Sequence, residues 1–264
     1  MIDLAQGACA ILDTAAPAEK VSRARALAEA WRDGRAAFTI PAQPPMRPAR
    51  PERPLLLPPR DMPKRKAGGS AEKRIALLHA LAHIELNAID LAWDIIARFG
   101  TAEMPRAFFE DWVKVGEEEA VHFSLLQARL NQLDADYGDL PAHDGLWQAA
   151  EETAHDLLAR LAIVPLVLEA RGLDVTPDTI ADFRRAGDDE SAAILDRIYQ
   201  DEIGHVAAGM RWFHHFADAA GLDPKQAWQE RVRRHFRGTL KPPFNDAARS
   251  DAGFDPEFYR PLSA

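Results

Sequence analysis

Residues 119–122 read Glu-Ala-Val-His, and residues 202–205 read Glu-Ile-Gly-His. Both stretches lie in long segments with apolar side chains at helical spacing, residues 104–135 and 189–220. Three residues along an α-helix correspond to about 300° of rotation, so each Glu shares a helix face with its His. The two motifs therefore predict two helices that each bring a carboxylate and an imidazole to a metal ion.

Two further helical segments each place one carboxylate inside an apolar run: Glu85 in residues 81–89, and Glu169 in residues 164–170. An ionised carboxylate in an apolar interior is unfavourable unless it is paired or bound to a metal. Segments with a single Glu thus alternate along the chain with segments that carry Glu-x-x-His. This order is the one that builds a carboxylate-bridged dimetal site inside a four-helix bundle. We expect the four helices at about residues 70–99, 104–135, 144–171 and 189–220, the third ending at Gly172, with a short helical piece after Pro177.

The spacing of these acids supports one shared site. Glu85 and Glu119 are 34 residues apart, and Glu169 and Glu202 are 33 residues apart, as expected for two similar helical hairpins. Four carboxylates would match the charge of two divalent ions, and two neutral imidazoles complete the set. The opposing interpretation is a group of ordinary salt-bridged helix residues without a metal. The predicted metal ligands are Glu85, Glu119, His122, Glu169, Glu202 and His205.

With these motifs, the chain resembles the ferritin-like superfamily and, more narrowly, the ferritin-like domain-of-unknown-function 455 (DUF455) family. The resemblance covers about residues 70–220. It is carried by His83-Ile84-Glu85-Leu86, Glu117-Glu118-Glu119-Ala120-Val121-His122-Phe123, Leu168-Glu169-Ala170-Arg171-Gly172-Leu173-Asp174 and Asp201-Glu202-Ile203-Gly204-His205-Val206. It implies an all-α, ferritin-like four-helix bundle in which these ligands bind iron. By analogy with dinuclear iron proteins, Glu119 and Glu202 would bridge the metals, and Glu85 and Glu169 would bind terminally.

The remaining segments lie around this bundle. Residues 3–34 predict one or two small helices broken by Pro17, and about 18 residues from Tyr137 to Ala154 suit a long crossover between the hairpins. Residues 41–70 hold nine of the 19 prolines and carry a net charge of +5, so they form a basic arm rather than a helix or a central strand. We favour a packing strap over a partner-binding arm. The predicted domains are residues 1–69, 70–221 and 222–264.

Composition limits the class of protein. A single cysteine and the lack of a secretory signal favour the cytoplasm, and no long apolar run predicts a transmembrane helix. A net charge of −9 argues against indiscriminate nucleic-acid binding, although a tRNA substrate, as in the tRNA-hydroxylase branch of the superfamily, stays open. A homodimer also stays open.

The predicted function follows from the metal site. Ferrous pairs held by carboxylates react with dioxygen, because oxygen ligands stabilise the oxidised metals. We expect an O2-dependent di-iron oxidoreductase, a hydroxylase or oxygenase acting on a small or medium organic substrate. Two iron ions are the expected cofactors, with manganese or a mixed pair as alternatives. The other hypotheses are a ferroxidase or iron-handling protein and a metal-free helical interaction module.

Several neighbouring residues have two interpretations each. Asp201 and Glu118 could accept hydrogen bonds from His122 and His205, respectively, or be exposed helix acids. For Tyr199 we favour a packed side chain over a pocket residue. The other residues for which we favour a structural or surface role are Arg171 as a helix cap, His79, His83, His214, His215 and the third Glu-x-x-His, Glu152 to His155.

Overall fold

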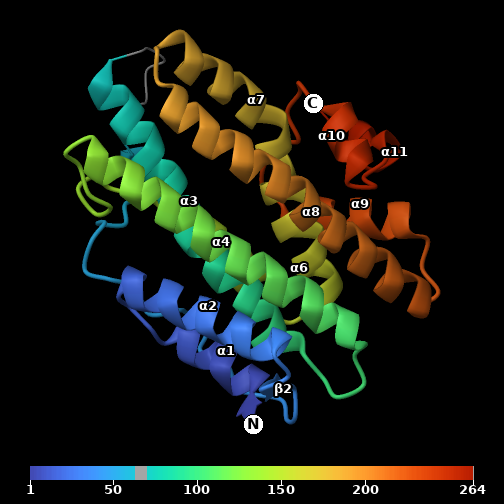
Figure 1. The fold of residues 1–264 in the computed structure, drawn as a ribbon. Helices are drawn as coiled ribbons and strands as arrows, with labels where there is room; N and C mark the ends of the chain where they lie inside the picture. Colours follow the sequence, from blue (N-terminus) through green and yellow to red (C-terminus); the bar gives the residue numbers. More distant parts are fainter. Residues whose placement is uncertain (63–69, 264) are drawn as a thin grey trace. The chain divides into compact units, whose positions relative to one another are not determined.

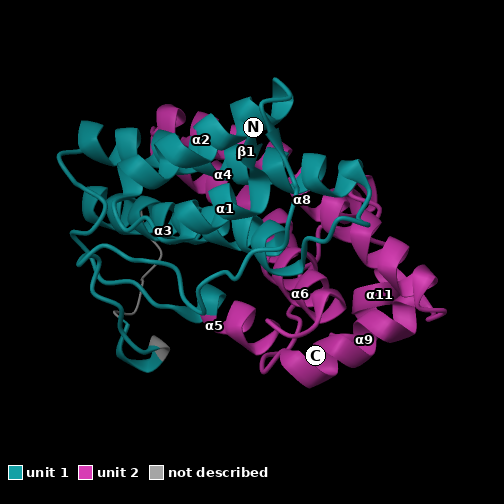
Figure 2. Cartoon of the chain, turned by 90° about the horizontal axis from the view of Figure 1, so that it is seen from below, with its two compact units in different colours: residues 1–147 teal, residues 148–264 magenta. Residues whose placement is uncertain are grey.

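The computed structural model describes residues 1–62 and 70–263, and almost all of their regular structure is helical. The chain divides into two compact units, Met1–Trp147 and Gln148–Ala264 (Figure 2). The strands of the described part are two residues long, β1 (Ile2–Asp3) and β2 (Ala36–Ala37), and pair in parallel. The all-α prediction is confirmed. Residues 63–69, the end of the predicted arm, lie outside the described residues.

The first unit is built on an antiparallel hairpin of two long helices, α3 and α4 (Figure 1). Shorter helices cover it, with α1 packed on α3 and α2 packed on α4. Pro17 begins α2 because proline suits the first turn of a helix, where its missing N–H has no partner to lose. The bounds are α1 (Leu4–Leu12), α2 (Pro17–Arg32), η1 (Pro59–Asp61), α3 (Ala71–Phe99) and α4 (Arg106–Gln132).

The described part of the proline-rich arm, residues 41–62, is bonded to this unit at several points. The Ala49 N–H donates to the Leu12 carbonyl at 2.8 Å, and the Leu57 N–H donates to the Ala142 carbonyl at 2.8 Å. Two of its cations also form ion pairs inside the unit, Arg47 with Asp144 and Arg50 with Asp90. The arm therefore serves as a packing strap, and part of its positive charge is neutralised within the chain.

The second unit contains the other helices. Its longest helix, α8, packs against α7, α6 and the π-helical turn η2 (Figure 1). The bounds are α6 (Leu157–Ile163), η2 (Val164–Glu169), α7 (Ala170–Arg185), α8 (Asp189–Ala219), α9 (Pro224–His235), α10 (Asp246–Asp251), α11 (Pro256–Tyr259) and η3 (Arg260–Leu262). The helix α5 (Gly145–Glu152) precedes them and crosses the division between the units.

The predicted third helix, residues 144–171, begins where expected, at Gly145, but it is not continuous and does not end at Gly172. It is interrupted at residues 153–156, because the Asp156 side chain caps a new helix by accepting from the Ala159 N–H at 3.1 Å. The chain then continues as a helix through Gly172 and Pro177 to Arg185. Proline removes the N–H that would bond the carbonyl four residues earlier, and the Asn245 amide donates to that Leu173 carbonyl at 3.1 Å instead. A single long-range bond thus lets the helix pass through proline.

One described helix, α3, is long and apolar enough to cross a membrane by length and composition. Of its most apolar window, 72% is buried inside the structure. Such burial is typical of the core helix of a soluble protein.

Candidate metal centre

Three of the predicted ligands meet in the interior of the first unit. Glu85 lies on α3, and Glu119 and His122 lie one turn apart on α4. One ligand atom from each of the three lies within 4.8 Å of the other two. His122 Nδ1 is 3.3 Å from Glu85 Oε2 and 3.4 Å from Glu119 Oε2. All three side chains are at most 6% exposed, so this triad consists of two carboxylates and one imidazole that are buried from solvent.

The electrostatics of this triad favour a bound cation. Burial, and next the neighbouring Glu119 carboxylate, raise the pKa of Glu85 well above its ordinary value. The contact with His122 acts in the opposite direction but is weaker. Two carboxylates held together out of water are unfavourable when both are ionised, and a divalent cation between them removes that repulsion. The residues of the first unit therefore fit a metal ion.

The second unit brings together two further predicted ligands. Glu202 and His205 lie one turn apart on α8, with Glu202 Oε1 3.5 Å from His205 Nδ1. Glu202 Oε2 is buried and has no hydrogen-bond partner among the described residues. A buried carboxylate oxygen in that state is costly, and metal coordination is one of the ways to satisfy it.

Glu169 is the sixth predicted ligand, and it ends the π-helical turn η2. That turn packs against α8, the helix that carries Glu202 and His205. Short π-helical turns are often found at functional sites, because they change the direction of a side chain within a continuous helix. The structure leaves Glu169 half-buried, and its role as a ligand stays a prediction.

Four nearby residues have local partners. Glu118 and Asp201 each lie near a cation one turn earlier on their own helices, with Lys114 Nζ 3.6 Å from Glu118 and Arg197 Nε 3.7 Å from Asp201. Tyr199 accepts a hydrogen bond from Asn245 Nδ2 at 2.9 Å, as the packed interpretation expects. The helix-cap interpretation of Arg171 is wrong, because α7 does not end there. Arg171 donates instead to the Lys241 carbonyl at 2.6 Å.

The other histidines for which the sequence favoured a structural or surface role have contacts of their own. His79 and His83 are buried on α3 and contact the connection that follows α4. His214 and His215 pack beside aromatic rings, Phe258 and Trp212. In the third Glu-x-x-His, Glu152 pairs with Arg237 at 2.6 Å, and the His155 ring lies near that of His235. These contacts agree with the structural interpretation of these residues.

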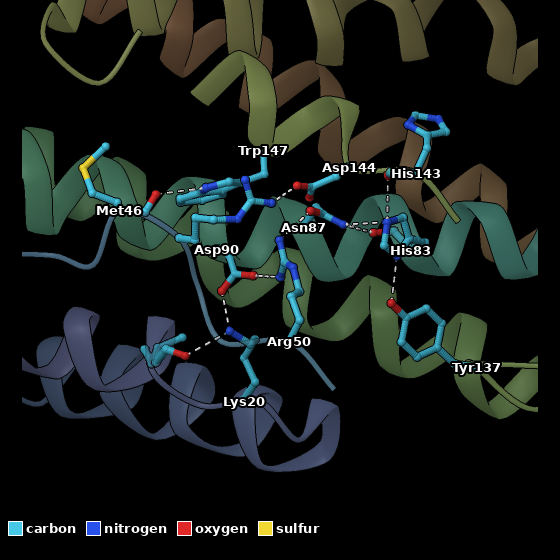
Figure 3. Close-up of polar contacts among 12 residues, drawn as sticks. Lys20, Met46, Arg50, His83, Asn87, Asp90, Tyr137, His143, Asp144 and Trp147 are labelled. Atoms are coloured by element: carbon cyan, nitrogen blue, oxygen red, sulfur yellow. Dashed lines mark hydrogen bonds and ion pairs between the residues drawn. The ribbon is translucent and has the colours of Figure 1, made fainter. Parts of the chain in front are cut away.

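Sequence reasoning missed a second polar set on α3, which we call the polar stripe. Its members are buried and are spaced by four, four, three and four residues: His79, His83, Asn87, Asp90 and Asp94. Figure 3 shows three of them with partners from the arm, α2 and the connection after α4. Helical spacing of polar residues in an otherwise apolar helix was the signal that could have revealed this stripe.

Comparisons with known proteins support the narrower part of the resemblance, to the DUF455 family. A protein of Haemophilus influenzae described as uncharacterized is 44% identical over 209 residues, which cover 77% of this chain and 72% of that protein. No solved structure matches. The family model described as "Protein of unknown function (DUF455)" matches residues 13–260. Since this match spans nearly the whole chain, the protein belongs to the DUF455 family.

Proposed function

We propose that this protein is an O2-dependent oxidoreductase with a dinuclear metal centre, iron in the first instance, that oxidises a small or medium organic substrate. The observation that carries the proposal is the buried triad of Glu85, Glu119 and His122, in which two carboxylates lie against one imidazole. Ordinary helix packing supplies no reason to bury two neighbouring carboxylates.

The second half of the proposed centre comes from Glu169, Glu202 and His205. The structure describes each set of ligands within its own unit, and the proposal that the two sets share a pair of ions rests on the sequence. The sets repeat the same residue types, and the glutamates are spaced by 34 residues in one and 33 in the other. Their four carboxylates equal the charge of two divalent ions, so the combined site would be neutral.

The donor types favour particular metals. Four carboxylates and two imidazoles provide hard oxygen and intermediate nitrogen ligands, which suit iron and manganese and offer no thiolate for copper(I) or structural zinc. A ferrous pair held in such a site supplies the electrons with which dioxygen is activated. The chain's own residues hold the ions, and the apolar side chains around the triad exclude bulk water.

Metal stoichiometry with paired variants tests the proposal. Protein purified without chelator and loaded anaerobically with ferrous iron should bind about two ions per chain. Glu119→Gln and Glu202→Gln remove one ligand charge each and should lower the bound iron by at least one ion. Their controls are Glu118→Gln and Asp201→Asn, which change the adjacent acids and should bind iron as the wild type does.

Oxygen exposure then separates the functions. Absorption of an oxo-bridged ferric pair after a stoichiometric reaction supports the oxidoreductase, whereas continued iron uptake supports an iron-handling protein. Fewer than about one ion per chain, with no effect of Glu119→Gln, supports the metal-free interaction module and overturns the proposal. An effect of Glu119→Gln without one of Glu202→Gln would show a site confined to the first unit and would contradict the dinuclear centre.

A further inference from the structure

The polar stripe lies on the face of α3 that points away from the metal triad. Its five positions span about 80° of the helix circumference, and Glu85 lies about 200° from their mean direction. One face of α3 thus carries a candidate ligand, and the opposite face carries a line of buried polar groups. Each of those groups needs a hydrogen-bond or ion-pair partner, since water does not reach it.

The arm supplies the central partner through Arg50. One Arg50 Nη donates to Asp90 and the other donates to Asn87 Oδ1 at 2.6 Å (Figure 3). Asn87 and Asp90 lie one turn apart on the stripe, so the planar guanidinium bridges two successive turns of α3. The Arg50 side chain is only 16% exposed, which means that this bridge is shielded from solvent.

Asn87, His83 and Asp90 of the stripe bond to groups other than Arg50. Asn87 Nδ2 donates to the His83 carbonyl at 2.7 Å, and His83 Nδ1 lies 2.8 Å from the Tyr137 hydroxyl (Figure 3). On the other side of Arg50, Lys20 from α2 also donates to Asp90. The stripe therefore connects the arm, α2 and the connection after α4 to one face of a single helix.

Such a bridge determines how α3 is rotated about its own axis. The Glu85 carboxylate lies about 6 Å from that axis, so a rotation of about 10° moves it by about 1 Å. Ligands must hold their positions within about 0.5 Å to form a metal site. The Arg50 guanidinium opposes this rotation because it bonds α3 at two points, Asn87 and Asp90, which lie two and five residues beyond Glu85. A flexible or single-point contact would restrict it less.

We propose that Arg50 is a positioning residue for the metal centre, which keeps α3 rotated so that Glu85 faces Glu119 and His122. This inference rests on the proposed function, because it assigns Arg50 an effect on metal affinity. Arg50 itself binds no metal and touches none of the three ligands; it acts through Asn87 and Asp90.

Two arginines of the arm provide a matched test. Arg50→Met removes the guanidinium and leaves Asp90 paired with Lys20, whereas Arg47→Met removes an ion pair with Asp144, which is not on α3. Arg50→Lys keeps the positive charge but cannot bond Asn87 and Asp90 together. We expect Arg50→Met to weaken the binding of ferrous iron by about tenfold or more, Arg50→Lys to give an intermediate loss, and Arg47→Met to leave the affinity unchanged.

Amide hydrogen exchange gives a readout that does not depend on metal. In the folded, metal-free protein, Arg50→Met should accelerate exchange in residues 81–91 of α3 more than in α4, and Arg47→Met should not. Equal metal affinity in both methionine variants would overturn the inference. So would a loss of affinity that is proportional to the decrease in Tm in both variants. If the wild type binds no metal, the proposed function and the effect on affinity both fail. If Arg50→Met does not fold, the lysine variant decides.

Discussion

Gly116 of α4 lies against the indole of Trp93 on α3, so closely that a Cβ at residue 116 would be 2.6 Å from the Trp93 nitrogen. Glu119 lies one turn further along the same helix. The absence of a side chain at residue 116 therefore lets the two ligand-bearing helices of the first unit approach each other next to the triad.

Gly116→Ala should force α3 and α4 apart and reduce the free energy of unfolding by about 1–3 kcal/mol, because the indole is fully packed and has no room to move. Iron affinity should fall with it. Gly172→Ala is the control, since no atom lies within 4 Å of a Cβ at that helical position. It should be neutral or stabilise the protein by up to about 1 kcal/mol. Urea unfolding of both variants checks this, and equal effects would contradict the close approach.

Asp90 should matter more for stability than either of its partners. Both Lys20 and Arg50 donate to its carboxylate. Asp90→Leu leaves the buried Lys20 and the half-buried Arg50 without their shared counter-charge and should cost about 3–5 kcal/mol. Lys20→Met keeps the pair of Asp90 and Arg50, so it should cost at least about 2 kcal/mol less. Denaturant titration of the two variants measures the difference, and the reverse order would refute this charge balance.

Acid should destabilise the protein through His83. Burial lowers the pKa of His83 from 6.5 to about 4, although its contact with the His143 carbonyl acts in the opposite direction. The unfolded chain binds more protons at this residue between those values, so folded stability is full above pH 6.5 and is lost as the pH falls towards 4. The expected loss is about 3 kcal/mol. Unfolding of the wild type and of His83→Gln at pH 7 and pH 4 isolates it, because the other titrating groups are shared. Parallel pH profiles would contradict the prediction.

The C-terminal segment should be held by one buried ion pair. Arg249 donates to both oxygens of Asp174 at 2.8 and 2.7 Å, and its guanidinium lies 4.4 Å from the centre of the Tyr259 ring. Arg249→Met leaves the buried Asp174 carboxylate with two weaker partners, Arg171 at 3.3 Å and the Asn245 N–H at 3.0 Å, and should cost about 3 kcal/mol. Arg260→Met breaks the exposed pair with Asp246 and should cost less than about 1 kcal/mol. Thermal unfolding compares them, and similar losses would argue against the buried pair.

The long helices and half of the site were accessible from the sequence. Periodic apolar positions predicted α3, α4 and α8, because such segments must bury one face whatever their partners are. The spacing of Glu119 and His122 predicted a shared helix face directly, and the structure brings Glu85 to them.

The missed features depend on residues far apart in the chain. Gly172 and Pro177 are local signals for the end of a helix, and they were overruled by Asn245, which lies about 70 residues later and satisfies the Leu173 carbonyl. The polar stripe was visible as a spacing, but the partner of its central residues is Arg50, in a segment that the sequence predicted to be a packing strap without indicating which residues it contacts. Local patterns do not identify such partners.

The strap formed by the arm also bears on how this protein can be divided. A fragment that begins at Ser70 would keep both long helices of the first unit and all six candidate ligands. It would lose Lys20 and Arg50, and with them the counter-charges of Asp90. Unless the N-terminal residues are replaced, such a fragment should expose the polar stripe of α3. It should then associate with itself or with other chains. The N-terminal residues thus do for α3 what a second subunit does in an obligate dimer, and they should be able to restore the fragment when added as a separate peptide.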